Sequence, residues 1–288
     1  TETSLIDVLP HQFLAVYDSM LPQPRLRFLL ADDAGAGKTI MSGLYIREML
    51  LRRLLKRVLI VPPAGLVGNW ERELRNLFRL NFRIVSAQSV TEDFNPFEES
   101  RYNFAILSID TARQDRVRAA LKLAPAYDLV IFDEAHKLSA TRNADLSEDL
   151  SRRYETANEI ALRTHHLLLL TATPHMGKDV PYFYLWKLLD PQQFSVPEAL
   201  QRAAPQTRKQ HLLRRMKEEM VNFEGNPLFP KRSSRTVSYP LNEAERTLYE
   251  ATTEYIQEYY ARTNAANRAS VGLALSVIQR RLASSTYA

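Results

Sequence analysis

The chain alternates between short runs of apolar residues and longer segments whose apolar residues recur at helical spacing. Runs without polar interruption predict strands buried on both faces, as in parallel sheets covered by helices. Strands are predicted at 26–31, 58–61, 82–85, 103–109, 127–132 and 167–170. Helices are predicted at 5–20, 40–55, 66–77 and 147–163, and another begins at Asp110 as its N-cap. This order predicts right-handed crossovers and an α/β fold, with about six or seven strands in a mainly parallel sheet flanked by helices.

The pattern changes after Pro174, where apolar strands give way to helical spacing. Helices are predicted at 180–189, 201–220, 242–263 and 269–282, with a short strand at 235–239. Polar segments at 92–101 and 139–145 predict loops. We therefore expect the α/β domain to be followed by a C-terminal helical extension.

Composition narrows the function classes. The 288 residues include no cysteine, which excludes disulfides, thiolate metal sites and a cysteine nucleophile, and favours a reducing cytoplasm. No apolar run reaches the length of a membrane span and no signal peptide opens the sequence, so we expect a cytoplasmic protein without a membrane partner. The net charge of +5 permits contact with nucleic acid without requiring it.

The strongest chemical signal is the segment Asp32-Asp33-Ala34-Gly35-Ala36-Gly37-Lys38-Thr39, which lies between a predicted strand and a predicted helix. Glycines let backbone N–H groups curl around a phosphate, and the helix N-terminus adds a positive dipole. Lys38 would reach the β- and γ-phosphates, and the Thr39 hydroxyl would ligate Mg²⁺. Asp32 stands where the strict motif has glycine, and the alternative is a glycine turn with an exposed lysine. The strand and helix on either side favour a phosphate-binding loop.

A second signal is the DEAH sequence Asp133-Glu134-Ala135-His136, which directly follows a predicted strand. Carboxylates at the C-terminal end of a parallel strand face the ligand crevice. Asp133 is placed to hold Mg²⁺ through water, and Glu134 to orient and deprotonate an attacking water. The alternative is a pair of solvated acids. His136 lacks a partner at metal-ligand spacing, which favours a hydrogen-bonding relay.

Weaker signals gain weight from their order along the chain. The Gln12 amide could read adenine as donor and acceptor, and Thr171 and Thr173 could bridge the nucleotide site to a neighbouring surface. Free N–H groups at 62–67, after the second predicted strand, could hold a nucleic-acid phosphate. The alternative is a helix cap with Trp70 as a core anchor, and this structural role is the favoured one for Trp70. We interpret the basic residues within 47–57 as a solvated helix face in preference to a DNA contact. The basic residues at 214–217 have the same two interpretations.

The ordered set of motifs resembles superfamily 2 helicase-like ATPases. Asp32 to Thr39 is similar to the Asp-Glu-x-Gly-x-Gly-Lys-Thr form of the Swi2/Snf2 branch, and the segments 188–194, 213–218 and 240–249 also look like Snf2 chains. Within that branch, the glycine loop, 171–175 and 279–285 resemble a divergent bacterial subgroup. This subgroup includes the RNA-polymerase-recycling ATPase and the helicase-like component of the DISARM phage-defence system. Ala34, Ala36 and 171–173 differ from eukaryotic remodellers, which puts a remodelling role in doubt more than ATP use.

The resemblance implies a RecA-like fold and a set of site residues. It implies ATP and Mg²⁺ as cofactors, double-stranded DNA as a partner, and defence-system or transcription partners. Translocation without strand separation is implied by the family alone. The implied residues are catalytic Lys38, Thr39, Asp133 and Glu134; nucleotide-binding Gln12, Asp33, Ala34, Gly35, Ala36, Gly37, Lys38, Thr39 and Ile40; metal-binding Thr39 and Asp133; coupling His136, Thr171 and Thr173; and nucleic-acid-binding Pro62, Gly65 and Ser108.

The resemblance also implies a domain organisation. Residues 1–190 would form the first RecA-like lobe, 191–240 its Snf2-type extension, and 241–288 the beginning of an inter-lobe helical region. A second RecA-like lobe of the same full-length chain would supply arginine fingers, and no second glycine-rich segment is present here. We therefore expect this chain alone to bind ATP weakly and hydrolyse it poorly.

Two other functions remain open at this point. An RNA helicase of the same superfamily shares the core motifs, although the Snf2-like segments after 188 argue against it. A nucleotide-switched nucleic-acid-binding module would not hydrolyse ATP, and the intact Lys38 and Glu134 argue against it.

Overall fold

The computed structural model describes residues 7–138, 140–142, 148–175, 177, 179–230, 235–236, 242–262, 271–272, 275–278 and 280. Contacts between residues divide the chain into two compact units, Thr1–Lys231 and Arg232–Ala288. The first unit is an α/β domain, and the second is mostly helical where it is described.

Within the described residues, the central sheet of the first unit has seven strands in the order β3-β4-β2-β5-β8-β1-β9. Every neighbouring pair is parallel. The strands are β1 (Arg27–Leu30), β2 (Val58–Val61), β3 (Arg83–Ile84), β4 (Phe104–Ile106), β5 (Leu129–Phe132), β8 (His166–Leu170) and β9 (Leu212–Leu213). The predicted α/β fold with a mainly parallel sheet is confirmed.

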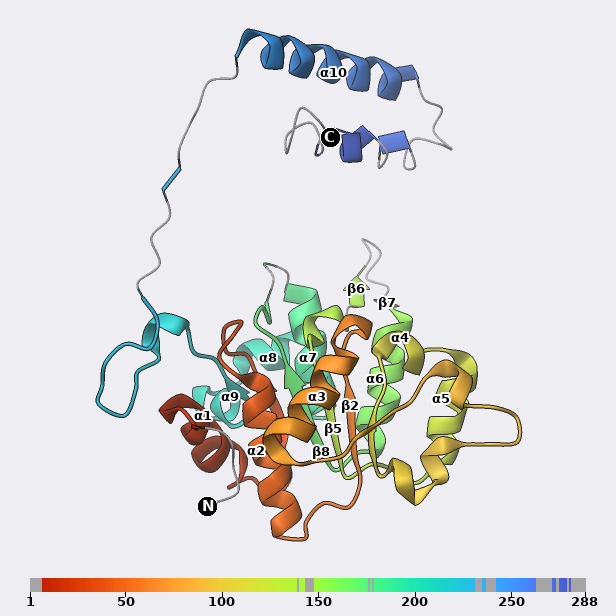
Figure 1. The fold of residues 1–288 in the computed structure, drawn as a ribbon, viewed down its shortest axis with the longest axis vertical. Coiled ribbons are helices and arrows are strands. Elements are labelled where there is room, and N and C mark those ends of the chain that lie inside the picture. Colours follow the sequence, from red (N-terminus) through yellow and green to blue (C-terminus); the bar gives the residue numbers. More distant parts are fainter. Residues whose placement is uncertain are drawn as a thin grey trace. The chain divides into compact units, whose positions relative to one another are not determined.

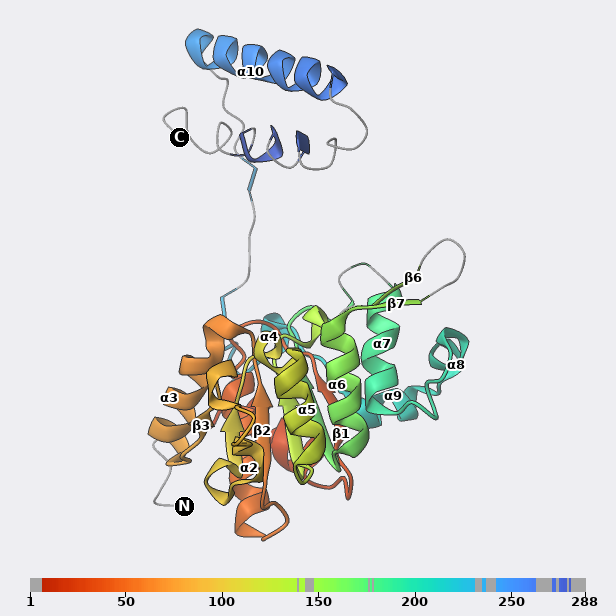
Figure 2. The same cartoon turned by 90° about the vertical axis from the view of Figure 1, so that its right-hand side faces the viewer.

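Helices cover both faces of this sheet (Figures 1 and 2). The α-helices of the first unit are α1 (Pro10–Leu14), α2 (Lys38–Leu51), α3 (Val67–Phe78), α4 (Ile109–Ala112), α5 (Asp115–Leu123), α6 (Arg152–Arg163), α7 (Asp179–Leu189), α8 (Pro197–Arg202) and α9 (Pro205–His211). A π-helix at Ala15–Met20 follows α1, and short 3-10 turns lie at Ala64–Leu66, Ala87–Ser89, Pro96–Glu98, Ser100–Tyr102, Ala135–Lys137 and Lys217–Glu219.

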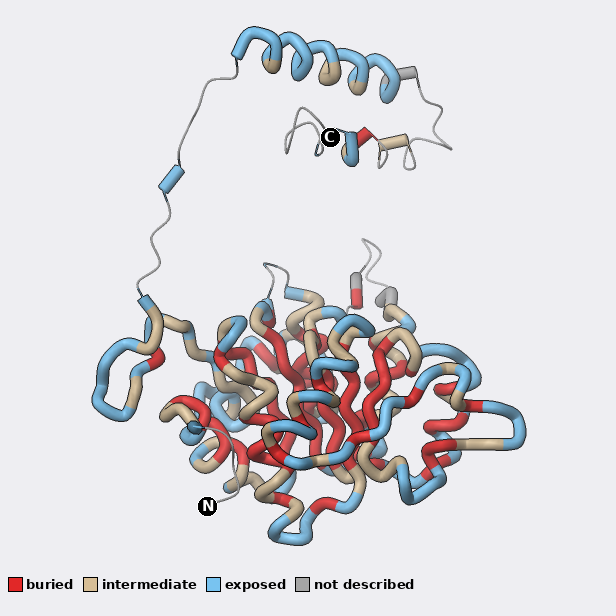
Figure 3. Tube along the Cα trace, viewed as in Figure 1, coloured by how far each residue is buried: buried red, intermediate tan, exposed pale blue. Residues whose placement is uncertain are grey.

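The alternation of side chains along each strand builds two cores. On β1, Phe28 and Leu30 pack with residues of α2 and α3, whereas Leu29 packs into the layer that contains α5, α6 and α7. All four residues of each of the strands β1, β2 and β5 are buried, and Figure 3 shows the sheet as the buried centre of the unit. Burial on both faces explains why these strands are apolar without alternation.

Five local predictions were wrong. The N-cap of α4 is Ser108, whose hydroxyl accepts the Thr111 N–H, so the strand that was predicted to extend to 109 ends at Ile106. Two strands, β6 (Ala140–Arg142) and β7 (Glu148–Leu150), form an antiparallel pair where a loop and a helix beginning at 147 were predicted. Ser151 caps α6 instead. The helix that was predicted at 201–220 is split into α8, α9, β9 and a 3-10 turn, because this segment returns to the sheet edge beside β1.

The second unit contains α10 (Glu243–Arg262), in agreement with the helix predicted at 242–263. Residues 271–272, 275–278 and 280 are helical, while most of the predicted helix at 269–282 and most of the predicted strand at 235–239 lie outside the described residues. Among the helices that the structure describes, we find none long and apolar enough to cross a membrane.

Candidate active site

Three neighbouring strands, β5, β8 and β1, end beside one another at the centre of the sheet. The segments that follow them therefore meet at one edge, where ligands bind in open parallel sheets. A cleft of about 450 Å³ lies there. It is lined by Ala34, Gly35, Gly37, Lys38, Thr39, Ile40, Glu73, Leu77, Asp133, Glu134 and Ala172. The structure thus brings the predicted glycine loop and the predicted acidic pair to the same cleft.

The glycine loop joins β1 to α2 and turns sharply at its two glycines. Gly35 and Gly37 have φ angles of 81° and 84°, which lie in the left-handed region that side chains with a Cβ rarely adopt. Gly37 is the N-cap of α2, so Lys38 and Thr39 begin the helix. A Cβ on Gly37 would overlap the Gln12 amide nitrogen. Both glycines are therefore required by the backbone that forms the loop.

Lys38 lies across the loop that precedes it. Its ammonium Nζ donates to the backbone carbonyls of Asp32 at 2.7 Å and Asp33 at 3.0 Å. Burial lowers the pKa of Lys38, while the carboxylates of Asp32, Asp133, Glu134 and Asp33 oppose this effect. An ammonium has three N–H donors, so these two carbonyls leave one for a phosphate oxygen.

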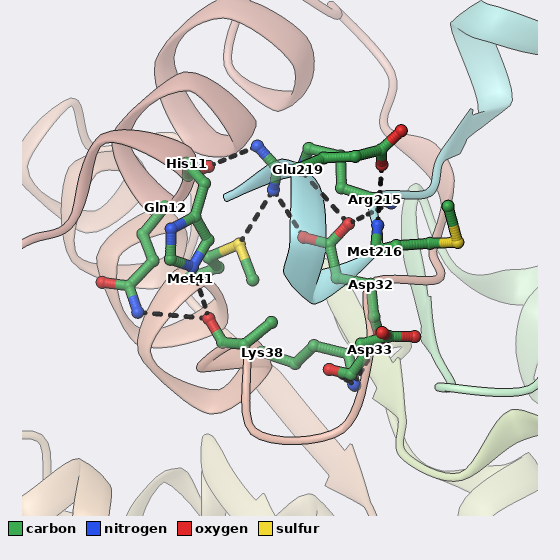
Figure 4. Close-up of polar contacts among 10 residues, drawn as sticks. His11, Gln12, Asp32, Asp33, Lys38, Met41, Arg215, Met216 and Glu219 are labelled. Carbon is green, nitrogen blue, oxygen red and sulfur yellow. Dashed lines mark hydrogen bonds and ion pairs between the residues drawn. The ribbon is translucent and has the colours of Figure 1, made fainter. Parts of the chain in front are cut away.

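The helix α1 supports the far end of the loop (Figure 4). The buried His11 and Gln12 side chains both reach the Ala36 carbonyl, from Nε2 atoms at 2.9 and 3.2 Å. The Leu9 N–H donates to the Gln12 Oε1 at 3.1 Å, so both ends of this amide are engaged within the protein. The structure shows Gln12 as a support of the loop, and its contact with adenine stays a prediction.

Asp133 and Glu134 follow β5 directly. The Trp70 indole donates from Nε1 to the Asp133 Oδ2 at 2.8 Å, and the Glu134 N–H donates to Oδ1 at 2.8 Å. Burial raises the pKa of Asp133, and the hydrogen bonds from Trp70 and Glu134 oppose that rise. Glu134 itself has a φ of 50°, an uncommon conformation for a residue with a side chain, which is typical of functional sites.

The predicted coupling residues lie together behind this acidic pair. His136 Nδ1 is 2.9 Å from the hydroxyl of the fully buried Thr171 and 3.2 Å from the Glu134 Oε2. The Thr173 N–H donates to the Thr171 hydroxyl at 3.1 Å. These contacts join the end of β5 to the end of β8, which is the geometry that a coupling role would use.

The predicted nucleic-acid contacts follow β2 and β4. Gly65 is exposed, with open space around its α-carbon. Pro62 is buried and its carbonyl accepts the Ile109 N–H at 3.2 Å, while the Ser108 hydroxyl caps α4. None of the three lines the cleft that the described residues form. A role in nucleic-acid binding remains a prediction for all three.

Two side-chain contacts that support these motifs were not predicted from the sequence. Trp70 was interpreted as a core anchor; it is buried, but its N–H also bonds to Asp133. Arg215 was grouped with surface cations, yet it forms an ion pair with the fully buried Asp32, at 2.5 Å between Nη2 and Oδ2. A buried carboxylate needs a cation, so Asp32 at the end of an apolar strand was the available signal.

The residues of the cleft fit a magnesium ion that also binds phosphate. Thr39 and Asp133 both line the cleft, and Mg²⁺ usually takes one or two protein oxygens together with phosphates and water. Within the described part of the chain, no group of three or more His, Asp or Glu side chains could hold a metal ion alone. A metal at this site would therefore rely on the nucleotide for further ligands.

A family model described as SNF2-related domain matches residues 23–283. The chain belongs to this family. The RNA polymerase-associated protein RapA of Vibrio parahaemolyticus is 35% identical over 197 residues, which cover 67% of this chain and 19% of that protein. RapA of Photobacterium profundum is 36% identical over 193 residues, again 19% of its length. The chain thus spans about a fifth of these relatives.

Solved structures share the fold. The Sulfolobus solfataricus SWI2/SNF2 ATPase core in complex with dsDNA superposes with a TM-score of 0.59 at 17% identity, over 97% of this chain and 58% of that chain. The Pyrococcus furiosus Hef helicase domain gives 0.51 at 17% identity, over 81% and 43%. The predicted Snf2 family and the predicted RecA-like fold are therefore confirmed.

Proposed function

We propose that this chain is the first, ATP-binding lobe of a Snf2-type motor that moves along double-stranded DNA. The observation that carries the proposal is the single cleft that Lys38 and Thr39 share with Asp133 and Glu134. A glycine loop alone would support phosphate binding. The acidic pair on the facing strand end adds the groups that hydrolysis requires.

The residues of the cleft have different roles in ATP hydrolysis. The loop N–H groups and Lys38 hold the phosphates, and the α2 dipole favours their negative charge. Thr39 and Asp133 would hold Mg²⁺, which neutralises charge that develops on the phosphates. Glu134 orients a water molecule and accepts its proton as the water oxygen bonds to the γ-phosphorus and the bond to ADP breaks.

The polymer and the partners are proposed from the relatives. The Sulfolobus solfataricus structure is described as a complex with dsDNA, and the RapA proteins are named as RNA polymerase-associated. We propose duplex DNA as the track, and a transcription complex or a phage-defence assembly as the partner. The proposed site of action is the cytoplasm.

A second RecA-like lobe is proposed to complete the site. Arginine fingers from such a lobe stabilise the transition state by orders of magnitude in rate. In the proposed organisation, residues 1–190 bind ATP, 191–240 extend this lobe and 241–288 begin the connection to the second lobe. The chain alone would then bind ATP and turn it over slowly.

The test is the ATPase rate of a longer protein that contains this lobe and a second lobe, beside this chain. Rates are measured without nucleic acid and with duplex DNA, single-stranded DNA or duplex RNA. We expect strong stimulation by duplex DNA in the long form, near silence in this chain, and loss of turnover in Glu134→Gln with ATP still bound. Stimulation by RNA would favour an RNA helicase, and a long form that no polymer stimulates would favour a nucleotide switch.

A further inference from the structure

The segment 213–217 lies late in the sequence of the first unit but contacts the phosphate loop. Strand β9 pairs with β1, and the Ala31 N–H donates to the Leu213 carbonyl at 2.7 Å. The Asp33 N–H donates to the Arg215 carbonyl at 3.2 Å, and the Asp33 carboxylate accepts the Lys217 N–H at 3.1 Å. The beginning of the phosphate loop is therefore bonded on its outer side to a segment more than 180 positions later, since Asp33 and Lys217 are 184 residues apart.

Arg215 is the centre of this contact (Figure 4). Its Nη2 and Nε donate to the two carboxylate oxygens of Asp32 at 2.5 and 3.2 Å, and its backbone N–H donates to Oδ1 at 2.9 Å. Asp32 has no exposed surface, so this guanidinium takes the place of water as the partner of its carboxylate. The Asp32 backbone carbonyl in turn accepts the Lys38 ammonium.

The same guanidinium also reaches the other end of the loop. Its Nη1 donates to the His11 backbone carbonyl at 2.6 Å, and the His11 ring bonds to the Ala36 carbonyl. Arg215 thus acts on the loop before Gly35 through Asp32 and after Gly35 through His11. A planar guanidinium can make these bonds together, whereas a lysine ammonium cannot match the fork of donors.

We propose that Arg215 is a positioning residue for nucleotide binding. It holds both ends of the phosphate loop at a fixed separation, so that Lys38 and the loop N–H groups face the phosphates. This inference rests on the proposed ATP site. It assigns a role to a residue that belongs to neither the glycine loop nor the acidic pair.

The test compares the affinity of this chain for mant-ATP with Mg²⁺, measured by fluorescence, across matched variants. We expect Arg215→Gln to weaken binding about tenfold or more, and Arg215→Lys to retain only part of the affinity. The control is Arg118→Gln, which removes a comparable fork from Glu159, at 2.6 Å to each carboxylate oxygen, in a helix pair away from the cleft. This variant is expected to bind mant-ATP as the wild type does.

The double variant Asp32→Asn with Arg215→Gln separates positioning from folding. It removes the buried charge together with its partner, so thermal stability should recover relative to Arg215→Gln while mant-ATP affinity stays low. Folded Arg215 variants that bind mant-ATP within about twofold of the wild type would overturn the inference. A wild type that binds no mant-ATP would instead overturn the proposed function on which the inference rests.

Discussion

At the residue scale, the acidic pair depends on an indole from another element. Trp70 on α3 donates to Asp133 after β5, although the two residues are 63 positions apart. Spacing along the chain locates Asp133 and Glu134 because they directly follow a buried strand. It does not reveal the Trp70 contact, because the packing of α3 against the strand ends decides which way the indole points. The acidic motif could therefore be predicted from the sequence, whereas the Trp70 hydrogen bond that supports it could not.

Replacing Trp70 with phenylalanine should move the pH dependence of ATP hydrolysis. The Trp70 hydrogen bond lowers the pKa of Asp133 against the rise caused by burial, so its loss raises that pKa further. Protonation of Asp133 would then begin at a higher pH, and activity on the acidic side of the profile should fall first. The stability cost should be below the roughly 3–5 kcal/mol of truncation to alanine. The measurement is kcat/KM against pH in the two-lobe form.

Trp186→Phe is the matched control for this prediction. Trp186 is fully buried on α7, and its indole N–H has no hydrogen-bond partner among the described residues. Its replacement should leave the pH profile in place. An acidic limb that does not move in Trp70→Phe would show that this indole does not set the protonation of Asp133.

At the element scale, the middle of α2 packs closely against the end of α3. Both helices lie on the same face of the sheet, and Gly43 on α2 faces the buried Phe78 ring so closely that a Cβ would overlap it. The sequence predicted both helices, because their apolar spacing is local. It did not predict β9, because two leucines form a strand only where β1 offers an unpaired edge. The antiparallel pair of β6 and β7 was missed because each strand is short and is defined by its pairing with the other.

Gly43→Ala should destabilise the domain, whereas Gly68→Ala should not. Overpacking a core costs about 1–3 kcal/mol, and the buried Phe78 ring has little room to move. Gly68 lies near the beginning of α3 with nothing within 4 Å of an added Cβ, so alanine there should stabilise by up to about 1 kcal/mol. Urea unfolding midpoints show whether each variant is less or more stable than the wild type. Equal stability of the two variants would contradict the close α2–α3 packing.

At the scale of the whole molecule, the proposed nucleotide cleft is built from segments that are distant in the sequence. The residues that line it extend from Ala34 to Ala172, and its outer support comes from Arg215. The parallel topology makes this possible, because it places the ends of β1, β5 and β8 beside one another. Motif order along the sequence was enough to predict the family and the fold. The chain spans about a fifth of the RapA proteins, so motor activity is a proposal for it.

The most direct test of the proposed ATP site is ATP binding to this chain in the presence of Mg²⁺, measured by calorimetry for the wild type and for Lys38→Ala. We predict one ATP bound by the wild type, little turnover, and an affinity about tenfold lower or more without the Lys38 ammonium. Lys122→Ala is the control, because Lys122 pairs with Glu159 at 2.8 Å outside the cleft, and it should bind ATP normally. Equal affinity in Lys38→Ala and the wild type would contradict the assignment of this cleft as the ATP site.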